Sequence, residues 1–135
     1  MKENEIAIIK RLNEFAKTPI KISDFEYSRF DAYNETTIFE IKYRHKYYEE
    51  TIIEFDKYAY NFMYSAHIKK EFVYAVQMDN KIYLFDIKDL ISDGYDFKWG
   101  WKEMPATSEF QNKNKKNKYI CPPILLISIF IICFF

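Results

Sequence analysis

Glycine is scarce in this chain, and its scarcity excludes some classes of ligand site. The sequence of 135 residues contains 2 glycines and 4 prolines. Loops that hold phosphate groups through backbone amides need closely spaced glycines, and neither GxGxxG nor GxxxxGK[ST] occurs. The sequence therefore argues against nucleotide binding of the dinucleotide or P-loop type.

Cysteine pairs and an excess of either charge are also missing. The two cysteines, Cys121 and Cys133, lie in the hydrophobic C-terminal segment, form no CxxC pair and have no histidine nearby. Neither a zinc site nor a disulfide framework is indicated. The 20 basic and 20 acidic residues balance. A nucleic-acid partner would therefore have to bind a local basic patch.

Aromatic residues are plentiful, with 12 tyrosines and 13 phenylalanines. This much apolar surface can offset the chain entropy lost on folding, so a folded chain with a single main domain is predicted. Ile, Lys, Asn, Tyr and Phe dominate, and their AT-rich codons indicate a low-GC genome such as those of many bacteria and phages. The charged, amphipathic N-terminus does not resemble a secretory signal, so the expected compartment is the cytoplasm of a bacterium or an infected host cell.

The spacing of apolar residues predicts an α/β (α+β) fold with the element order α-β-β-α-β-β. Helical periodicity runs from about Asn4 to Lys17 and again from about Tyr48 to Ile68. Alternating β-branched and aromatic residues predict strands. The four predicted strands cover residues 25–33, 37–44, 72–78 and 81–87, the last two joined as a hairpin at Asp79-Asn80. Such an order suggests a mixed central sheet flanked by helices.

The strand predicted over residues 37–44 is unusual because one of its faces is charged. Alternation places Glu40, Lys42 and Arg44 on that face and apolar residues on the other. Asp31 lies on the preceding strand. A loop of two or four residues would bring Asp31 to the face of Glu40, and a four-residue loop would place the two directly opposite each other. A three-residue loop would turn Asp31 away.

Two opposed carboxylates destabilise a sheet unless a cation lies between them. Mg²⁺ prefers oxygen ligands, polarises a phosphoryl group and lowers the pKa of a bound water molecule. A nearby lysine can orient that water and stabilise negative charge on the phosphate. A metal site and a solvated strand face with an incidental ion pair are the two interpretations of this pattern.

The segment Phe30-Asp31 followed by Glu40-Ile41-Lys42 resembles the PD-(D/E)xK superfamily of restriction-endonuclease-like nucleases. The resemblance covers about residues 4 to 88 and includes the order of helices and strands, although Phe30 replaces the proline of the motif. It implies that Asp31, Glu40 and the backbone carbonyl of Ile41 bind Mg²⁺, with Mn²⁺ as a substitute. It also implies that Lys42 serves the nucleophilic water.

The resemblance suggests further site residues. Some members add an acidic residue from the first helix, for which Glu14 or Glu5 is the candidate. Others add a basic residue from the helix after the motif, where Lys57 is the best match. Arg44, Lys46 and Lys57 are predicted to contact phosphate groups of the nucleic acid.

The predicted function is Mg²⁺-dependent hydrolysis of phosphodiester bonds in DNA rather than RNA. A homodimer would allow both strands to be cut, but the sequence carries no mark of one. Two rival hypotheses remain. One is a catalytically inactive nucleic-acid-binding or structural member of the same fold, and the other is a small membrane-anchored interaction protein.

The C-terminal part divides the chain by composition. Residues 1–110 are predicted to form the nuclease-like domain, 111–119 a basic polar linker and 120–135 a hydrophobic tail. The lysine-rich linker either contacts a nucleic-acid backbone or is simply solvated. The tail is shorter than the roughly 20 apolar residues that span a bilayer. A membrane anchor, a buried segment and a frameshift product are its three open explanations.

Overall fold

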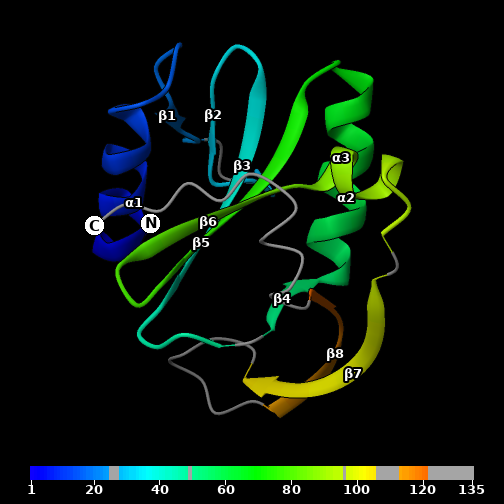
Figure 1. Ribbon diagram of the computed structural model, residues 1–135. Helices are drawn as coiled ribbons and strands as arrows, with labels where there is room; N and C mark the ends of the chain where they lie inside the picture. Colours follow the sequence, from blue (N-terminus) through cyan, green and yellow to red (C-terminus); the bar gives the residue numbers. More distant parts are fainter. Residues whose placement is uncertain (25–27, 49, 96, 106–112, 122–135) are drawn as a thin grey trace.

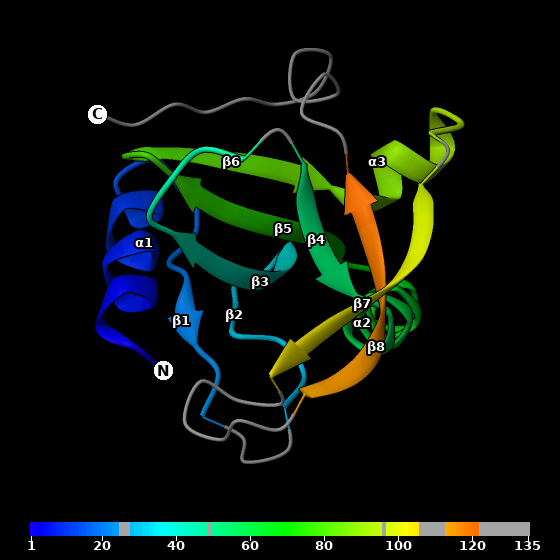
Figure 2. The same cartoon turned by 90° about the horizontal axis from the view of Figure 1, so that it is seen from below.

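The computed structural model describes residues 1–24, 28–48, 50–95, 97–105 and 113–121, with side chains described up to residue 97. A five-stranded mixed sheet of order β1-β2-β3-β5-β6 forms its centre, with α1 on one face and α2 and α3 on the other (Figure 1). A three-stranded sheet of order β4-β8-β7 lies beside α2 (Figure 2). The elements are α1 Glu3–Asn13, β1 Lys21–Ile22, β2 Ala32–Tyr33, β3 Thr37–Arg44, β4 Thr51–Glu54, α2 Phe55–His67, β5 Glu71–Met78, β6 Lys81–Asp86, α3 Ile87–Ser92, β7 Lys98–Pro105 and β8 Lys113–Cys121.

Helix α1 contributes an apolar stripe that packs on the sheet, and its buried side chains are Ile8, Ile9 and Leu12. The helix ends at Asn13, earlier than the predicted end near Lys17. The side-chain amide of Asn13 donates to the carbonyl of Ile20 at 3.0 Å, and its oxygen accepts from the Ile20 N–H at 2.7 Å. These two bonds lead the chain out of the helix and into β1.

The hairpin of β2 and β3 tests the prediction that an even loop brings Asp31 to the face of Glu40. Tyr33 pairs with Ile38, so four residues separate the last paired positions. The side-chain oxygen of Asn34 accepts from the backbone N–H groups of Thr36 and Thr37 and stabilises this turn. Strand β3 has the predicted bounds. β2 covers only residues 32–33 of the predicted strand 25–33, of which residues 25–27 lie outside the described part of the chain.

The second predicted helix is wrong at its start, because residues 51–54 form strand β4 and α2 begins at Phe55 rather than near Tyr48. The β-branched run Thr51-Ile52-Ile53 favours extended backbone. Ile53 is buried in the main core, and β4 pairs with β8, so tertiary packing reinforces the local preference.

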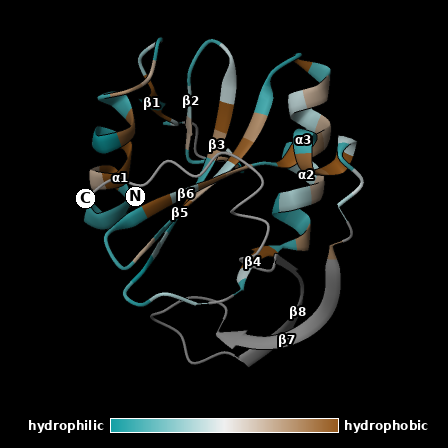
Figure 3. Ribbon diagram, viewed as in Figure 1, coloured by the Kyte–Doolittle hydropathy of each residue, from teal (hydrophilic) through white to brown (hydrophobic). Residues whose placement is uncertain are grey.

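The mixed sheet is confirmed. β3 and β5 pair in parallel, and the other neighbours in the central sheet pair antiparallel. β5 and β6 form the predicted hairpin, with Asp79 and Asn80 at positive φ values of 50° and 67°. Hydrophobic residues concentrate on the central strands and on the sides of the helices that meet them (Figure 3).

The segment predicted as a linker forms most of β8, which pairs with both β4 and β7. The division into domain, linker and tail stays a prediction, and residues 122–135 of the tail lie outside the described residues. Within the described part of the chain, no helix is long and apolar enough to cross a membrane.

Candidate metal centre

Asp31 and Glu40 come together at the end of the β2–β3 hairpin. The paired register ends at Ala32 and Phe39, and the backbone N–H of Asp31 donates to the carbonyl of Phe39 at 2.8 Å. The Oδ2 atom of Asp31 accepts a hydrogen bond from the backbone N–H of Ile41 at 2.7 Å. The negative charge of Asp31 also raises the pKa of Glu40. The structure therefore brings the two predicted metal ligands to the same place.

Glu40 is buried, with 5% of its surface exposed, although it carries an ionisable group. Its Oε1 atom accepts from the Nζ atom of Lys57 at 2.9 Å. Its Oε2 atom has no hydrogen-bond partner among the described residues. Burial first, and then the charge of Asp31, raise the pKa of Glu40 to about 8, while Lys57 and Lys42 oppose the rise. A solvated strand face is thus excluded as the setting of Glu40.

A divalent cation fits this arrangement. An unpartnered buried carboxylate oxygen is costly. Here that oxygen belongs to Glu40, beside a second carboxylate on Asp31. Oxygen atoms from one or two carboxylates are the usual protein ligands of Mg²⁺. The residues present therefore match the ion that the sequence predicts.

Lys42 shares the charged face of β3 with Glu40. Burial lowers the pKa of Lys42, the positive charges of Arg44 and Lys57 lower it further, and Glu5 and Glu54 oppose this effect. A lysine with a lowered pKa releases its proton more readily than an exposed one. The pKa of Lys42 therefore lies below that of an exposed lysine.

Lys57 occupies the first turns of α2 and reaches Glu40 across the interface between helix and sheet. Its side chain is 42% exposed. Burial lowers the pKa of Lys57, but the charge of Glu40 and the hydrogen bond to it outweigh burial and raise the pKa. The sequence predicted Lys57 as a nucleic-acid contact and did not foresee this ion pair.

A pocket surrounds these groups and contains residues that sequence reasoning missed. Tyr74 was missed because it reaches Glu40 only through the parallel pairing of β3 with β5. Its hydroxyl donates to the carbonyl of Ile52 at 2.7 Å and ties β4 to the central sheet. Ile52 and Glu54 were missed because β4 was read as helix; its β-branched residues were the available signal. The pocket is lined by Glu40, Lys42, Arg44, Ile52, Ile53, Glu54, Lys57 and Tyr74.

The remaining predicted residues lie at varying distances from the pocket. Glu14 is exposed at the C-cap of α1, and no contact in the described residues links it to the centre. Glu5, the alternative on the same helix, is half-buried and acts electrostatically on Lys42. Lys46 is exposed just beyond the end of β3. Metal binding by the carbonyl of Ile41 stays a prediction.

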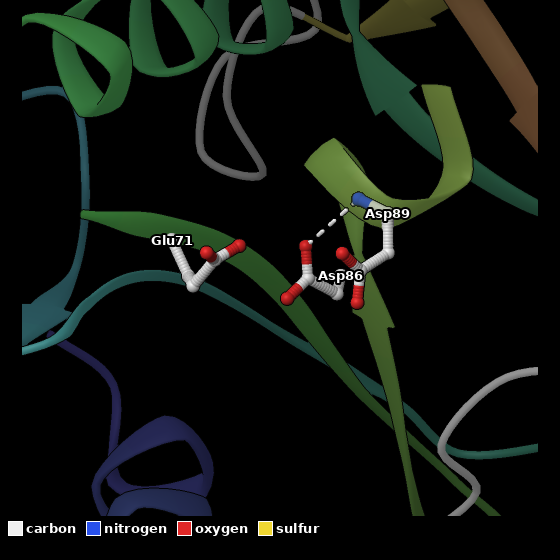
Figure 4. Close-up of side chains that lie close together, drawn as sticks. All are labelled: Glu71, Asp86 and Asp89. Carbon is white, nitrogen blue, oxygen red and sulfur yellow. Dashed lines mark hydrogen bonds between the residues drawn. The ribbon is translucent and has the colours of Figure 1, made fainter. Parts of the chain in front are cut away.

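A second group of carboxylates could also hold a metal ion (Figure 4). Glu71 at the start of β5, Asp86 at the end of β6 and Asp89 in α3 bring one ligand oxygen each within 4.8 Å of one another. The side chain of Asp86 accepts from the N–H of Asp89 at 3.1 Å. Burial raises the pKa of Asp86 to about 6, and Glu71 and Asp89 add to the rise. The sequence did not single out these residues.

No protein-family model matches this chain, and no curated protein sequence matches it. Among solved structures, it is similar to Hjc, a Holliday junction resolvase from the archaeal hyperthermophile Archaeoglobus fulgidus. The TM-score is 0.55 over 94% of this chain and 92% of that chain, with 8% sequence identity. At this identity the likeness concerns the fold alone. It confirms the mixed α+β fold with a five-stranded mixed sheet flanked by helices.

Proposed function

We propose that this protein is a metal-dependent nuclease that hydrolyses phosphodiester bonds in DNA. One observation supports the proposal most. Glu40 is buried beside Asp31, with one carboxylate oxygen on Lys57 and the other without a hydrogen-bond partner among the described residues. A buried carboxylate of this kind is destabilising on its own. A function that uses the Oε2 atom of Glu40 accounts for the presence of this buried carboxylate.

Asp31, Glu40 and the carbonyl of Ile41 would hold the ion, which we propose to be Mg²⁺ with Mn²⁺ as a substitute. When bound, the ion polarises the phosphoryl group and lowers the pKa of water. The support from this chain is the oxygen-only donor set, two members of which lie on the largely buried strand β3.

Lys42 is the proposed partner of the attacking water. Its lowered pKa allows the amine to take a proton from water while the water oxygen bonds to phosphorus and the opposite ester bond breaks. The leaving oxygen then takes a proton from solvent. Lys57 remains charged beside Glu40 and stabilises negative charge that develops on the phosphate.

DNA would approach through the open side of the pocket. Arg44 lines the pocket and Lys46 is exposed just beyond it, so both are proposed to contact phosphates next to the cleaved one, together with the exposed part of Lys57. The fold likeness to a Holliday junction resolvase supports DNA as the nucleic acid. A homodimer with two such centres is a further part of the proposal.

The test is cleavage by the full chain of supercoiled plasmid, linear duplex and four-way junction DNA, with Mg²⁺ or Mn²⁺. Asp31→Asn and Lys42→Ala should each lower the rate on the order of 10²-fold or more. Asp89→Asn is the matched control, since it removes an acidic group from the other carboxylate cluster. Thermal unfolding shows whether each variant is folded. A folded wild-type protein that cleaves none of these substrates, or cleavage that survives both substitutions, contradicts the proposal.

A further inference from the structure

One face of α2 carries tyrosines next to the proposed metal centre. Lys57, Tyr60, Asn61 and Tyr64 follow helical spacing and share a stripe of the helix. The side-chain amide of Asn61, which is fully buried, donates to the carbonyl of Arg29 at 3.1 Å. The segment that precedes Asp31 therefore contacts the same stripe of α2 from which Lys57 reaches Glu40.

The aromatic rings in this region form a nearly parallel ladder. Tyr60 and Tyr64 have ring centroids 5.9 Å apart with planes 14° apart. Tyr64 and Phe30 follow at 5.8 Å and 16°. Phe30 and Tyr64 are half-buried, whereas Tyr60 is 44% exposed. The ladder thus holds an exposed tyrosine ring in a fixed orientation at its outer end.

Arg29 adds a cationic group to that outer end. Its guanidinium group lies over the Tyr60 ring, with the central carbon 5.2 Å from the ring centroid. Its ion pair with Asp56 spans 3.8 Å, with the two side chains 50% and 63% exposed. An exposed pair of this length contributes little stability, so the guanidinium can shift toward an incoming phosphate. When the guanidinium moves off the ring to bind a phosphate, it leaves a ring face on which a base can stack, so the two side chains together are complementary to a nucleotide.

The tyrosine lies close to the proposed site of cleavage. Tyr60 follows Lys57 by three residues, which is a rise of about 4.5 Å along a helix. Phe30 directly precedes Asp31. The ring and the lysine that contacts Glu40 are thus carried by adjacent turns of the same helix.

We propose that Tyr60 and Arg29 bind an unpaired nucleotide of the DNA substrate, with the base on the tyrosine ring and its phosphate on the guanidinium. The inference rests on the proposed function and specifies its substrate class. A base inside a duplex is already stacked on its neighbours and must be extruded before it can reach the ring. The protein accordingly prefers DNA with unpaired bases at the cleaved site over fully paired duplex.

The test is binding in EDTA, measured by fluorescence anisotropy, to a duplex with a single-stranded overhang and to the same duplex with blunt ends. Tyr60→Leu should weaken binding to the overhang substrate roughly tenfold and leave blunt-duplex binding nearly unchanged. Tyr60→Phe keeps the ring and should bind like wild type. Phe15→Leu is the control, because it removes a ring that is 63% exposed at the far end of α1. Arg29→Gln should weaken overhang binding and reduce its salt dependence.

The inference is overturned if Tyr60→Leu and Tyr60→Phe bind alike, or if Tyr60→Leu weakens both substrates equally. It is also overturned if Tyr60→Leu changes only self-association in sedimentation velocity, which would make the ladder a surface for a second copy of the chain. The proposed function is judged separately, by Mg²⁺-dependent cleavage that Asp31→Asn abolishes. A wild-type protein that neither binds nor cleaves DNA contradicts both.

Discussion

The two groups of carboxylates in this protein differ in burial and in their cationic neighbours. Glu40 is buried beside Asp31 and paired with Lys57, whereas in the exposed group Glu71 and Asp89 are exposed and Asp86 is half-buried. No described lysine or arginine forms an ion pair with the exposed group. By number of carboxylates the exposed group offers more metal ligands. By burial and the presence of lysines, the buried pair is the better candidate for a catalytic centre.

The difference shows that exposure to solvent determines how strongly repulsion between like charges destabilises the protein. The pKa of Glu40 rises to about 8 and that of Asp86 to about 6, with burial as the largest cause in both. Water and salt screen repulsion among exposed groups, so an exposed acidic cluster persists without a ligand. A buried carboxylate oxygen has no such screening. Its presence therefore says more about function than the size of an acidic cluster does.

The largest expected effect is on metal-dependent cleavage, and it distinguishes the two groups of carboxylates. Glu40→Gln should lower Mg²⁺-dependent cleavage on the order of 10²-fold or more and abolish tight Mn²⁺ binding in calorimetry. Asp86→Asn should leave cleavage within about threefold of wild type, because it lies outside the proposed centre. The reverse pattern would move the catalytic centre to the exposed cluster.

A second prediction concerns Lys57, the cation that pairs with the buried carboxylate of Glu40. Lys57→Met should lower the free energy of unfolding by about 1 kcal/mol at pH 9, where Glu40 is ionised and would lose its partner. At pH 6 Glu40 holds a proton in the folded state, so the loss should be smaller. Denaturant unfolding at both pH values measures the difference. Arg29→Gln, which breaks the exposed pair with Asp56, should have little effect at either pH.

The third prediction is the pH dependence of the buried carboxylate. Folding raises the pKa of Glu40 from 4.5 to about 8. Its contribution to the free energy of unfolding is thus fully present below about pH 4.5 and is lost as the pH rises through about 8. Wild type should therefore lose more stability than Glu40→Gln between pH 5 and pH 9. Mn²⁺ should reduce this loss, since it binds the ionised form. Parallel curves for the two proteins would contradict the burial of an ionisable group.

The smallest expected effect is on thermal stability and concerns Asp86, in the second group of carboxylates. Folding raises the pKa of Asp86 from 3.8 to about 6, so its contribution to stability is lost as the pH rises through about 6. Asp86→Asn should consequently raise the melting temperature at pH 7.5 by about 2 to 4 °C and change it little at pH 4. Calorimetric melting at the two pH values measures this. A lower melting temperature at pH 7.5 would show that the cap on α3 outweighs the repulsion.

Local patterns in the sequence predicted the β2–β3 hairpin well. Alternation gave the bounds of β3, and the pairing of Tyr33 with Ile38 has the even loop that the parity argument required, although β2 is much shorter than the predicted strand. Asp79-Asn80 gave the β5–β6 hairpin, because both residues tolerate positive φ. These features depend on neighbours in the chain, which a single sequence displays.

Features that depend on distant residues were not predicted. β4 was read as the start of a helix, since its strand partner β8 lies far along the chain. α3 has only 6 residues and is marked chiefly by its capping residue Asp86, so its apolar pattern is too short to recognise. The ion pair of Lys57 with Glu40 needs the packing of α2 on the sheet. Spacing along the sequence carries no signal for such contacts.

The parallel pairing of β3 with β5 has a consequence for how the protein reaches its folded state. Thr37 pairs with Glu71, 34 positions further along the chain, whereas Asp31 and Glu40 belong to one local hairpin. Local contacts generally form sooner than distant ones. We therefore expect the two carboxylates to meet before Lys57 reaches Glu40. We expect divalent cations to speed refolding and chelators to slow it, so that the ion acts as a folding partner before it acts as a cofactor.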